Sequence, residues 1–137
     1  MNVVLIQCVG KKKPRKCKAK DLYDSTWFRY ALSYVQSLNP DKVFILSAKY
    51  GLVDPEEEIE PYDETLNNKS VSEIRAWAAK LLASLQERTD VAKDTFIILA
   101  GEKYRTYLAD YLANLDIPMK GLRIGEQLKW LKERCTQ

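Results

Sequence analysis

The chain contains no histidine, and among its 137 residues there are only three cysteines, Cys8, Cys17 and Cys135. Three cysteines cannot all pair with one another, and none of them has the spacing of a metal ligand. The lack of histidine further disfavours a zinc site. We therefore expect no metal and no cofactor, and cysteine usage of this kind favours the reducing cytoplasm.

Long hydrophobic runs are also missing. No segment approaches the roughly 20 continuous apolar residues that a membrane helix requires. The first ten residues, MNVVLIQCVG, are apolar and precede the basic segment, whereas a secretory signal has the opposite order. We expect a cytoplasmic protein that makes no use of a membrane, and the apolar start is better explained as the first strand of the fold.

The formal net charge is only +3, but the charges are segregated. One block of cations lies between Lys11 and Lys20, and one block of carboxylates lies between Asp54 and Glu64. A small net charge disfavours a dedicated nucleic-acid binder, although weak binding through the basic block is compatible with it. Both blocks fall between regular elements, which makes them candidates for function.

Hydrophobic periodicity predicts alternating strands and helices. Continuous apolar runs predict strands over Asn2–Gln7, Val43–Leu46 and Thr95–Ala100, with a short fourth strand over Ile117–Lys120. Capped amphipathic segments predict helices from Asp24 or Ser25 to Leu38, from Ser70 to Arg88, from Gly101 to Leu115, and near the end to Arg134. No repeat or flexible linker separates these elements, so residues 1–137 are expected to form a single α/β domain.

Alternating elements of this kind predict a three-layer, Rossmann-like fold with a mainly parallel sheet of about four strands and helices on both faces. In such sheets, ligands bind beyond the carboxyl ends of the strands. Cys8, Ser47 and Gly101 each follow a predicted strand. We therefore expect them to lie at one edge of the sheet and to mark one crevice.

The first of these loops, QCVGKKK, combines a glycine with a lysine triplet. Gly10 permits close backbone approach, and Lys11 or Lys13 can neutralise phosphate or carboxylate. The pattern is neither a Walker loop nor a dinucleotide fingerprint, and a solvated loop explains it equally. Cys8 can pack at the strand end or take a direct part in the site.

The segment SAKYGLVDPEEEIEPYD is the most informative part of the chain. Ser47 and Lys49 leave a strand, Gly51 lets the backbone turn back, and Tyr62 and Asp63 follow a proline. Structured loops of this length in small domains are usually functional, although a lid packed by Tyr50 and Tyr62 is the structural alternative. Without histidine, acid–base chemistry would use Asp63, Lys49, Cys8 or another such group.

The third loop offers Gly101 at a strand-to-helix turn, where helix amides suit an anion, with Tyr104 in the following turn. Tight turning alone also explains this glycine. From the residues, Asp63, Lys49 and Cys8 are the catalytic candidates. The candidate substrate-binding residues are Gly10, Lys11, Lys13, Tyr23, Ser25, Ser47, Tyr50, Gly51, Tyr62, Gly101 and Tyr104.

Five ordered segments carry a resemblance to a known group: QCVGKKK, AKDLYDSTWFR, ILSAKYGLVDPEEEIEPYD, LAGEKYR and GLRIGEQLKWL. Together they resemble the YaaA-related small domains of unknown function, and more loosely the peroxide-stress protein family YaaA, which is associated with DNA binding. A remoter similarity is to the lyase-type domain of archaeosine synthases. Three segments would correspond to it: Leu22 to Ser25, Ser47 with Gly51 to Val53, and Tyr62 with Asp63. The chain lacks that family's histidine and Pro-Cys pair.

This resemblance implies a Rossmann-like fold with a site for a nucleobase or nucleoside. The leading hypothesis is an enzyme that acts on a modified nucleobase, nucleoside or nucleotide, at the glycosidic bond or a base substituent. Tyr23, Tyr50 or Tyr62 would stack on the base. Two alternatives are a DNA-binding protein of the oxidative-stress response and a non-enzymatic interaction module whose acidic loop docks a basic partner.

Overall fold

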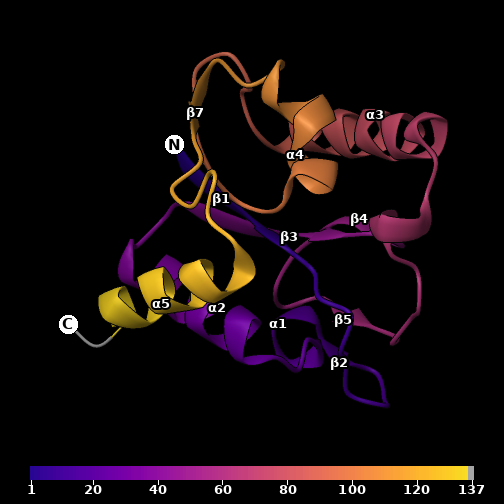
Figure 1. Cartoon of the computed structure of the whole chain (residues 1–137). Helices are drawn as coiled ribbons and strands as arrows, with labels where there is room; N and C mark the ends of the chain where they lie inside the picture. Colours follow the sequence, from indigo (N-terminus) through magenta and orange to yellow (C-terminus); the bar gives the residue numbers. More distant parts are fainter. Residues whose placement is uncertain (136–137) are drawn as a thin grey trace.

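A computed structural model describes residues 1–135 of the chain (Figure 1). A five-stranded sheet with the order β4-β3-β1-β6-β7 forms its centre. The strands are β1 (Asn2–Gln7), β3 (Lys42–Ser47), β4 (Gly51–Val53), β6 (Thr95–Leu99) and β7 (Asn114–Asp116). All neighbouring pairs are parallel except β3 and β4. This confirms the predicted α/β fold with a mainly parallel, Rossmann-like sheet.

Helices cover both faces of this sheet (Figure 1). One side carries α3 (Val71–Arg88) and α4 (Glu102–Ala109), and the other carries α2 (Thr26–Ser37) and α5 (Ile124–Cys135). The strands β1, β3 and β6 are apolar on both faces because both are covered. Ser70 begins α3 with the predicted capping box, and Ser25 begins α2 by accepting a hydrogen bond from the Phe28 N–H.

Two elements predicted from the sequence differ from those in the structure. The prediction of a helix to Leu115 was wrong, because α4 ends at Ala109 and the chain then enters β7, which pairs with β6. The strand predicted over Ile117–Lys120 is also wrong. There the Lys120 N–H donates to the Ile117 carbonyl, which closes a turn. Pro118, which has no N–H, lies inside that turn.

The segment from Ser47 to Lys69 contains more regular structure than the sequence predicts. After a three-residue turn, β4 returns antiparallel along β3, with Ser47 opposite Gly51. Gly51 has a φ of +74°, the left-handed conformation that such hairpin turns require. The short strand β5 (Glu58–Ile59) and the turn η1 (Leu66–Asn68) follow.

The two oppositely charged blocks lie together. In the basic block, β2 (Cys17–Lys18) pairs antiparallel with β5 of the acidic block and continues into α1 (Ala19–Leu22). Lys18 and Lys20 each form an ion pair with Glu56, at 2.9 and 2.7 Å. Part of the positive charge that is visible in the sequence is therefore neutralised within the fold.

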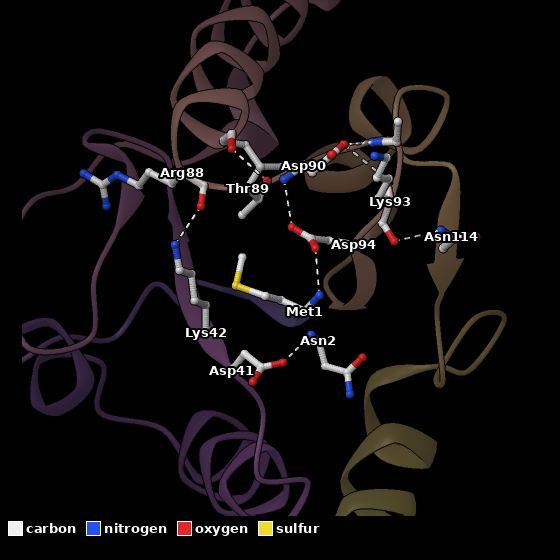
Figure 2. A network of polar contacts seen from close by, with 12 residues as sticks. Met1, Asn2, Asp41, Lys42, Arg88, Thr89, Asp90, Lys93, Asp94 and Asn114 are labelled. Carbon is white, nitrogen blue, oxygen red and sulfur yellow. Dashed lines mark hydrogen bonds and ion pairs between the residues drawn. The ribbon is translucent and has the colours of Figure 1, made fainter.

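The amino ends of the strands are tied together by a polar network (Figure 2). The Met1 amino group lies 2.7 Å from the Asp94 carboxylate, whose other oxygen accepts the Asp90 N–H. The Asp41 carboxylate accepts the Asn2 N–H at 2.7 Å. These contacts link the starts of β1, β3 and β6, and they leave the opposite edge of the sheet for the loops that carry the candidate site.

Candidate functional site

The carboxyl ends of β1, β3 and β6 lie side by side, as predicted. In the parallel register Gln7 is opposite Leu46, and Ile6 is opposite Leu99. The Cys8 N–H donates to the Leu46 carbonyl, and the Gly101 N–H donates to the Gln7 side-chain oxygen at 2.7 Å. Cys8, Ser47 and Gly101 therefore lie at one edge of the sheet, and the prediction that they do so is confirmed.

Ser47 organises a buried group of hydroxyls at this edge. The side chain is fully buried and accepts the N–H groups of Lys49 and Tyr50. With both acceptor positions occupied, its own proton goes to the Tyr62 hydroxyl at 2.8 Å. The Tyr62 hydroxyl lies 2.6 Å from that of Tyr23, so the three residues form one continuous chain of hydrogen bonds.

Burial controls the ionisation of these phenols. It raises the pKa of Tyr62 and of Tyr23 well above the usual range, and both side chains stay neutral over the physiological pH range. Burial also raises the pKa of Tyr104, whose hydroxyl accepts the Cys8 thiol at 3.5 Å. The tyrosines can therefore offer hydroxyl protons but no negative charge.

Lys12 lies over this group. Its ammonium nitrogen is 4.2 Å from the ring centre of Tyr62 and 5.9 Å from that of Tyr23, and it donates to the Gly10 carbonyl. Desolvation lowers the pKa of Lys12, although the charges of Cys8 and Asp63 oppose this change. The sequence prediction favoured Lys11 or Lys13, but both of those side chains are exposed whereas Lys12 is half-buried.

Three hollows meet around Gly10. The polar hollow, of about 270 Å³, is lined by Gln7, Cys8, Val9, Gly10, Lys12, Asp63, Glu64, Thr65, Asn67 and Tyr104. The apolar hollow, of about 450 Å³, is lined by Gln7, Val9, Gly10, Lys11, Ser25, Trp27, Gly101, Ile124 and Gln127. A third hollow, of about 350 Å³, is lined by Gly10, Lys12, Lys13, Pro14, Pro61, Tyr62 and Asp63.

The structure separates the two charged residues that the sequence paired as catalytic candidates. Asp63 is exposed and lines both the polar and the third hollow. Lys49 is exposed in the hairpin turn, with its ammonium 5.3 Å from the ring centre of Tyr50, and it lines none of the three hollows. Tyr50 is itself 37% exposed.

Several other predicted site residues have clear structural tasks. Ser25 caps α2 as well as lining the apolar hollow, and Gly51 makes the hairpin turn. The Gly101 N–H is occupied by the Gln7 side chain, so this amide is not free to bind an anion. These structural tasks explain why serine and glycine occur at these positions, whether or not the residues also contact a ligand.

Sequence reasoning did not single out Gln7, Lys12 or Gln127. Gln127 accepts the Trp27 indole N–H at 3.0 Å and donates to the Leu122 carbonyl, which fixes one wall of the apolar hollow. Only the triplet containing Lys12 gave a local signal. Gln127 lies 100 residues from Trp27, and only the packing of α5 on α2 brings the two together.

Within residues 1–135, no three cysteine, aspartate or glutamate side chains lie together as ligands for a metal ion. In the same part of the chain, no helix is both long and apolar enough to cross a membrane.

A further hollow of about 380 Å³ lies between α3 and α4, away from the strand ends, and its lining contains none of the predicted site residues.

Comparison with known proteins gives one family. The model of a family of unknown function, DUF6884, matches residues 3–133. The chain belongs to this family. The match includes all the strands and helices around the site, apart from the first residue of β1 and the last two of α5. A search of curated proteins finds no match for the chain.

Proposed function

We propose that this DUF6884 protein is an enzyme that acts on a nucleobase, nucleoside or nucleotide, at the glycosidic bond or at a base substituent. The observation that carries the proposal is the pairing of an apolar hollow, walled by Trp27, with a polar hollow that contains Cys8, Lys12 and Asp63. They share Gln7, Val9 and Gly10 at the carboxyl edge of a parallel sheet, the usual position of ligands in this architecture.

The residues of the polar hollow suit proton transfer. Asp63 is a solvated carboxylate and can accept a proton, while Lys12, Tyr104 and the Cys8 thiol can donate one. Cys8 also carries a thiol, a side-chain group that can serve as a nucleophile, and the Lys12 ammonium lines the same hollow. Asp63 and Cys8 are therefore proposed as catalytic groups and Lys12 as their cationic partner.

A panel of nucleobases, nucleosides and nucleotides tests this function, with binding measured by calorimetry and turnover by chromatography. We expect at least one compound to bind, and we expect Asp63→Asn and Cys8→Ser each to reduce binding or turnover at least about tenfold without loss of the fold. Asp110→Asn, at an exposed helix end, is the control. If Lys49→Met reduces activity as well, Lys49 belongs to the site. If no compound binds, the proposal is wrong.

The alternatives make different predictions at the same edge of the sheet. A pure interaction module requires no hollow at the strand ends, whereas three hollows meet there. A DNA-binding protein would use the basic block, but Glu56 already pairs with two of its lysines.

A cytoplasmic location stays a prediction, and the three cysteines, which are all free, are consistent with it.

A further inference from the structure

Gln7 lies between the apolar and polar hollows, with its amide in a defined orientation. The Gly101 N–H is a donor, so the side-chain atom of Gln7 that it meets at 2.7 Å must be the oxygen. The amide nitrogen of Gln7 therefore points elsewhere, and among residues 1–135 it has no acceptor. Because Gln7 lines both hollows, its two N–H groups are available to a ligand there.

The apolar hollow suits a flat ring. Val9, Trp27 and Ile124 supply its apolar surface, and Ile124 is 64% exposed at the first position of α5. The Trp27 ring is held by the hydrogen bond of its indole to Gln127, so its orientation is fixed before a ligand arrives. Both polar ends of Gln127 are occupied in this way, which leaves Gln7 as the side-chain amide that can contact the edge of the ring.

The polar hollow suits sugar hydroxyls better than phosphate. Asp63 and Glu64 are both exposed carboxylates, and Lys12 is the single cation in the lining. Carboxylates accept hydrogen bonds from hydroxyls, and they repel a phosphate dianion. Thr65 and Asn67 add further groups that can pair with hydroxyls. The cations Lys11 and Lys13 line the other two hollows.

We propose that the ligand of this site is a ribonucleoside without phosphate, bound with its base in the apolar hollow and its ribose hydroxyls on Asp63 and Glu64. This inference rests on the proposed function and narrows it to one substrate class. The Gln7 amide donates to an acceptor on the edge of the base, such as a carbonyl or an unprotonated ring nitrogen. The glycosidic bond then lies near Gly10, where the two hollows meet beside Cys8.

The test compares four forms of each common base, which are the free base, the ribonucleoside, the 2′-deoxynucleoside and the ribonucleoside 5′-monophosphate, by calorimetry on the full chain. We expect a ribonucleoside to bind at least about tenfold more tightly than either of the other two sugar-containing forms, because the deoxy form loses one charged hydrogen bond and the carboxylates repel the phosphate. A monophosphate that binds as tightly as its nucleoside overturns the inference and places the phosphate on Lys11 or Lys13.

Gln7→Glu is the decisive variant, because it retains an oxygen for the Gly101 N–H and replaces the free amide by a second acceptor. We expect it to keep its thermal stability and to weaken ribonucleoside binding at least about tenfold. Unchanged binding would overturn the assigned role of Gln7. Gln86→Glu, on α3 in the hollow away from the strand ends, is the matched control.

Variants in the polar hollow, together with the compound panel, distinguish the proposed function from the narrower inference that the ligand is a ribonucleoside. At least one of Asp63→Asn and Glu64→Gln should weaken the ribonucleoside more than the 2′-deoxynucleoside, because the contact to the 2′-hydroxyl is already missing in the deoxynucleoside. If free bases or nucleotides bind and ribonucleosides do not, the substrate class is wrong while the proposed function stands. If no member of the panel binds, both fail.

Discussion

At the scale of single residues, the most consequential arrangement is the one around Ser47, Tyr62 and Tyr23. These side chains come from three separate segments, and all are at least nine-tenths buried. Their hydroxyls satisfy one another and the turn amides of Lys49 and Tyr50, so buried polar groups are tolerated at the sheet edge. The same contacts hold the loop that positions Asp63.

Tyr62→Phe tests this arrangement. The change removes the acceptor of the Ser47 proton and the partner of Tyr23 while it keeps the ring, so the free energy of unfolding should fall by about 1–3 kcal/mol. Urea unfolding followed by tryptophan fluorescence measures this. Tyr111→Phe is the control, because Tyr111 is 59% exposed and should change stability by less than about 0.5 kcal/mol. Equal stabilities in the two variants would contradict the network.

Asp94 makes stability depend on pH. Its hydrogen bond with the Met1 amino group lowers the pKa of Asp94 and raises that of the amine. A lowered carboxyl pKa gives stability that is present above the unfolded value near 4 and is lost as the pH falls through the folded value. The raised amine pKa gives stability that is full below about 8 and is lost as the pH rises through the folded value.

Asp94→Asn should therefore lower the melting temperature most between about pH 4 and pH 8, and much less at pH 2. Differential scanning calorimetry across this range checks it. Asp110→Asn, at an exposed position, should give a melting temperature close to that of the wild type at every pH. A melting-temperature difference for Asp94→Asn that does not change with pH would show that the ion pair is not its cause.

At the scale of elements, the hairpin of β3 and β4 fixes the site. Because β4 returns along β3, the turn amides reach the Ser47 hydroxyl, and the Trp77 indole on α3 donates to the Ser47 carbonyl at 2.9 Å. The turn therefore fixes the Ser47 side chain, and α3 fixes its backbone carbonyl. The position of Tyr62, and with it Asp63, depends on this small element.

Two glycines should respond in opposite ways to the same substitution. Gly51→Ala places a side chain at a φ of +74° and should cost about 1–2 kcal/mol. Gly125→Ala, near the start of α5 and with open space around the added carbon, should stabilise by up to about 1 kcal/mol. Chemical denaturation of both variants measures the free energies. A neutral Gly51→Ala would show that the turn relaxes to another form.

At the scale of the whole molecule, the two charged blocks are one structural unit. The pairing of β2 with β5 brings Lys18 beside Glu56, and hydrogen bonds from Lys20 and Lys18 hold the pKa of Glu56 at about 2. Glu56 thus stays ionised at any physiological pH. The five remaining cations of the block make no ion pair with any of residues 1–135; Lys12 lies over the Tyr62 ring, and the others are Lys11, Lys13, Arg15 and Lys16.

Duplex DNA should consequently bind weakly, and Glu56→Gln should strengthen that binding. Two lysines become available to phosphates, so the log–log slope of affinity against salt should steepen by up to about 1.8. Fluorescence anisotropy with labelled DNA at several salt concentrations measures this, with Glu102→Gln as the control. Tight binding of the wild type at physiological salt would favour the DNA-binding alternative.

The layered α/β fold, and the edge of the sheet that carries the candidate site, could both be predicted from local patterns in the chain. Strands buried on both faces are continuous apolar runs, and helix caps are local signals, so both are visible without any tertiary contact. The same reasoning placed Cys8, Ser47 and Gly101 together, because parallel strands align their carboxyl ends. It predicted β1, β3 and β6 to within about one residue, as the periodicity of long elements allows.

Which polar residues face the hollows depends on tertiary contacts that local patterns do not encode. Short strands such as β4 and β7 exist because a neighbouring strand supplies hydrogen bonds, and three residues carry too little pattern to predict them. The choice of Lys12 over its neighbours depends on which side of the backbone meets the Tyr62 ring. The Gln7 amide is oriented by Gly101, 94 residues away, a contact that no local spacing encodes.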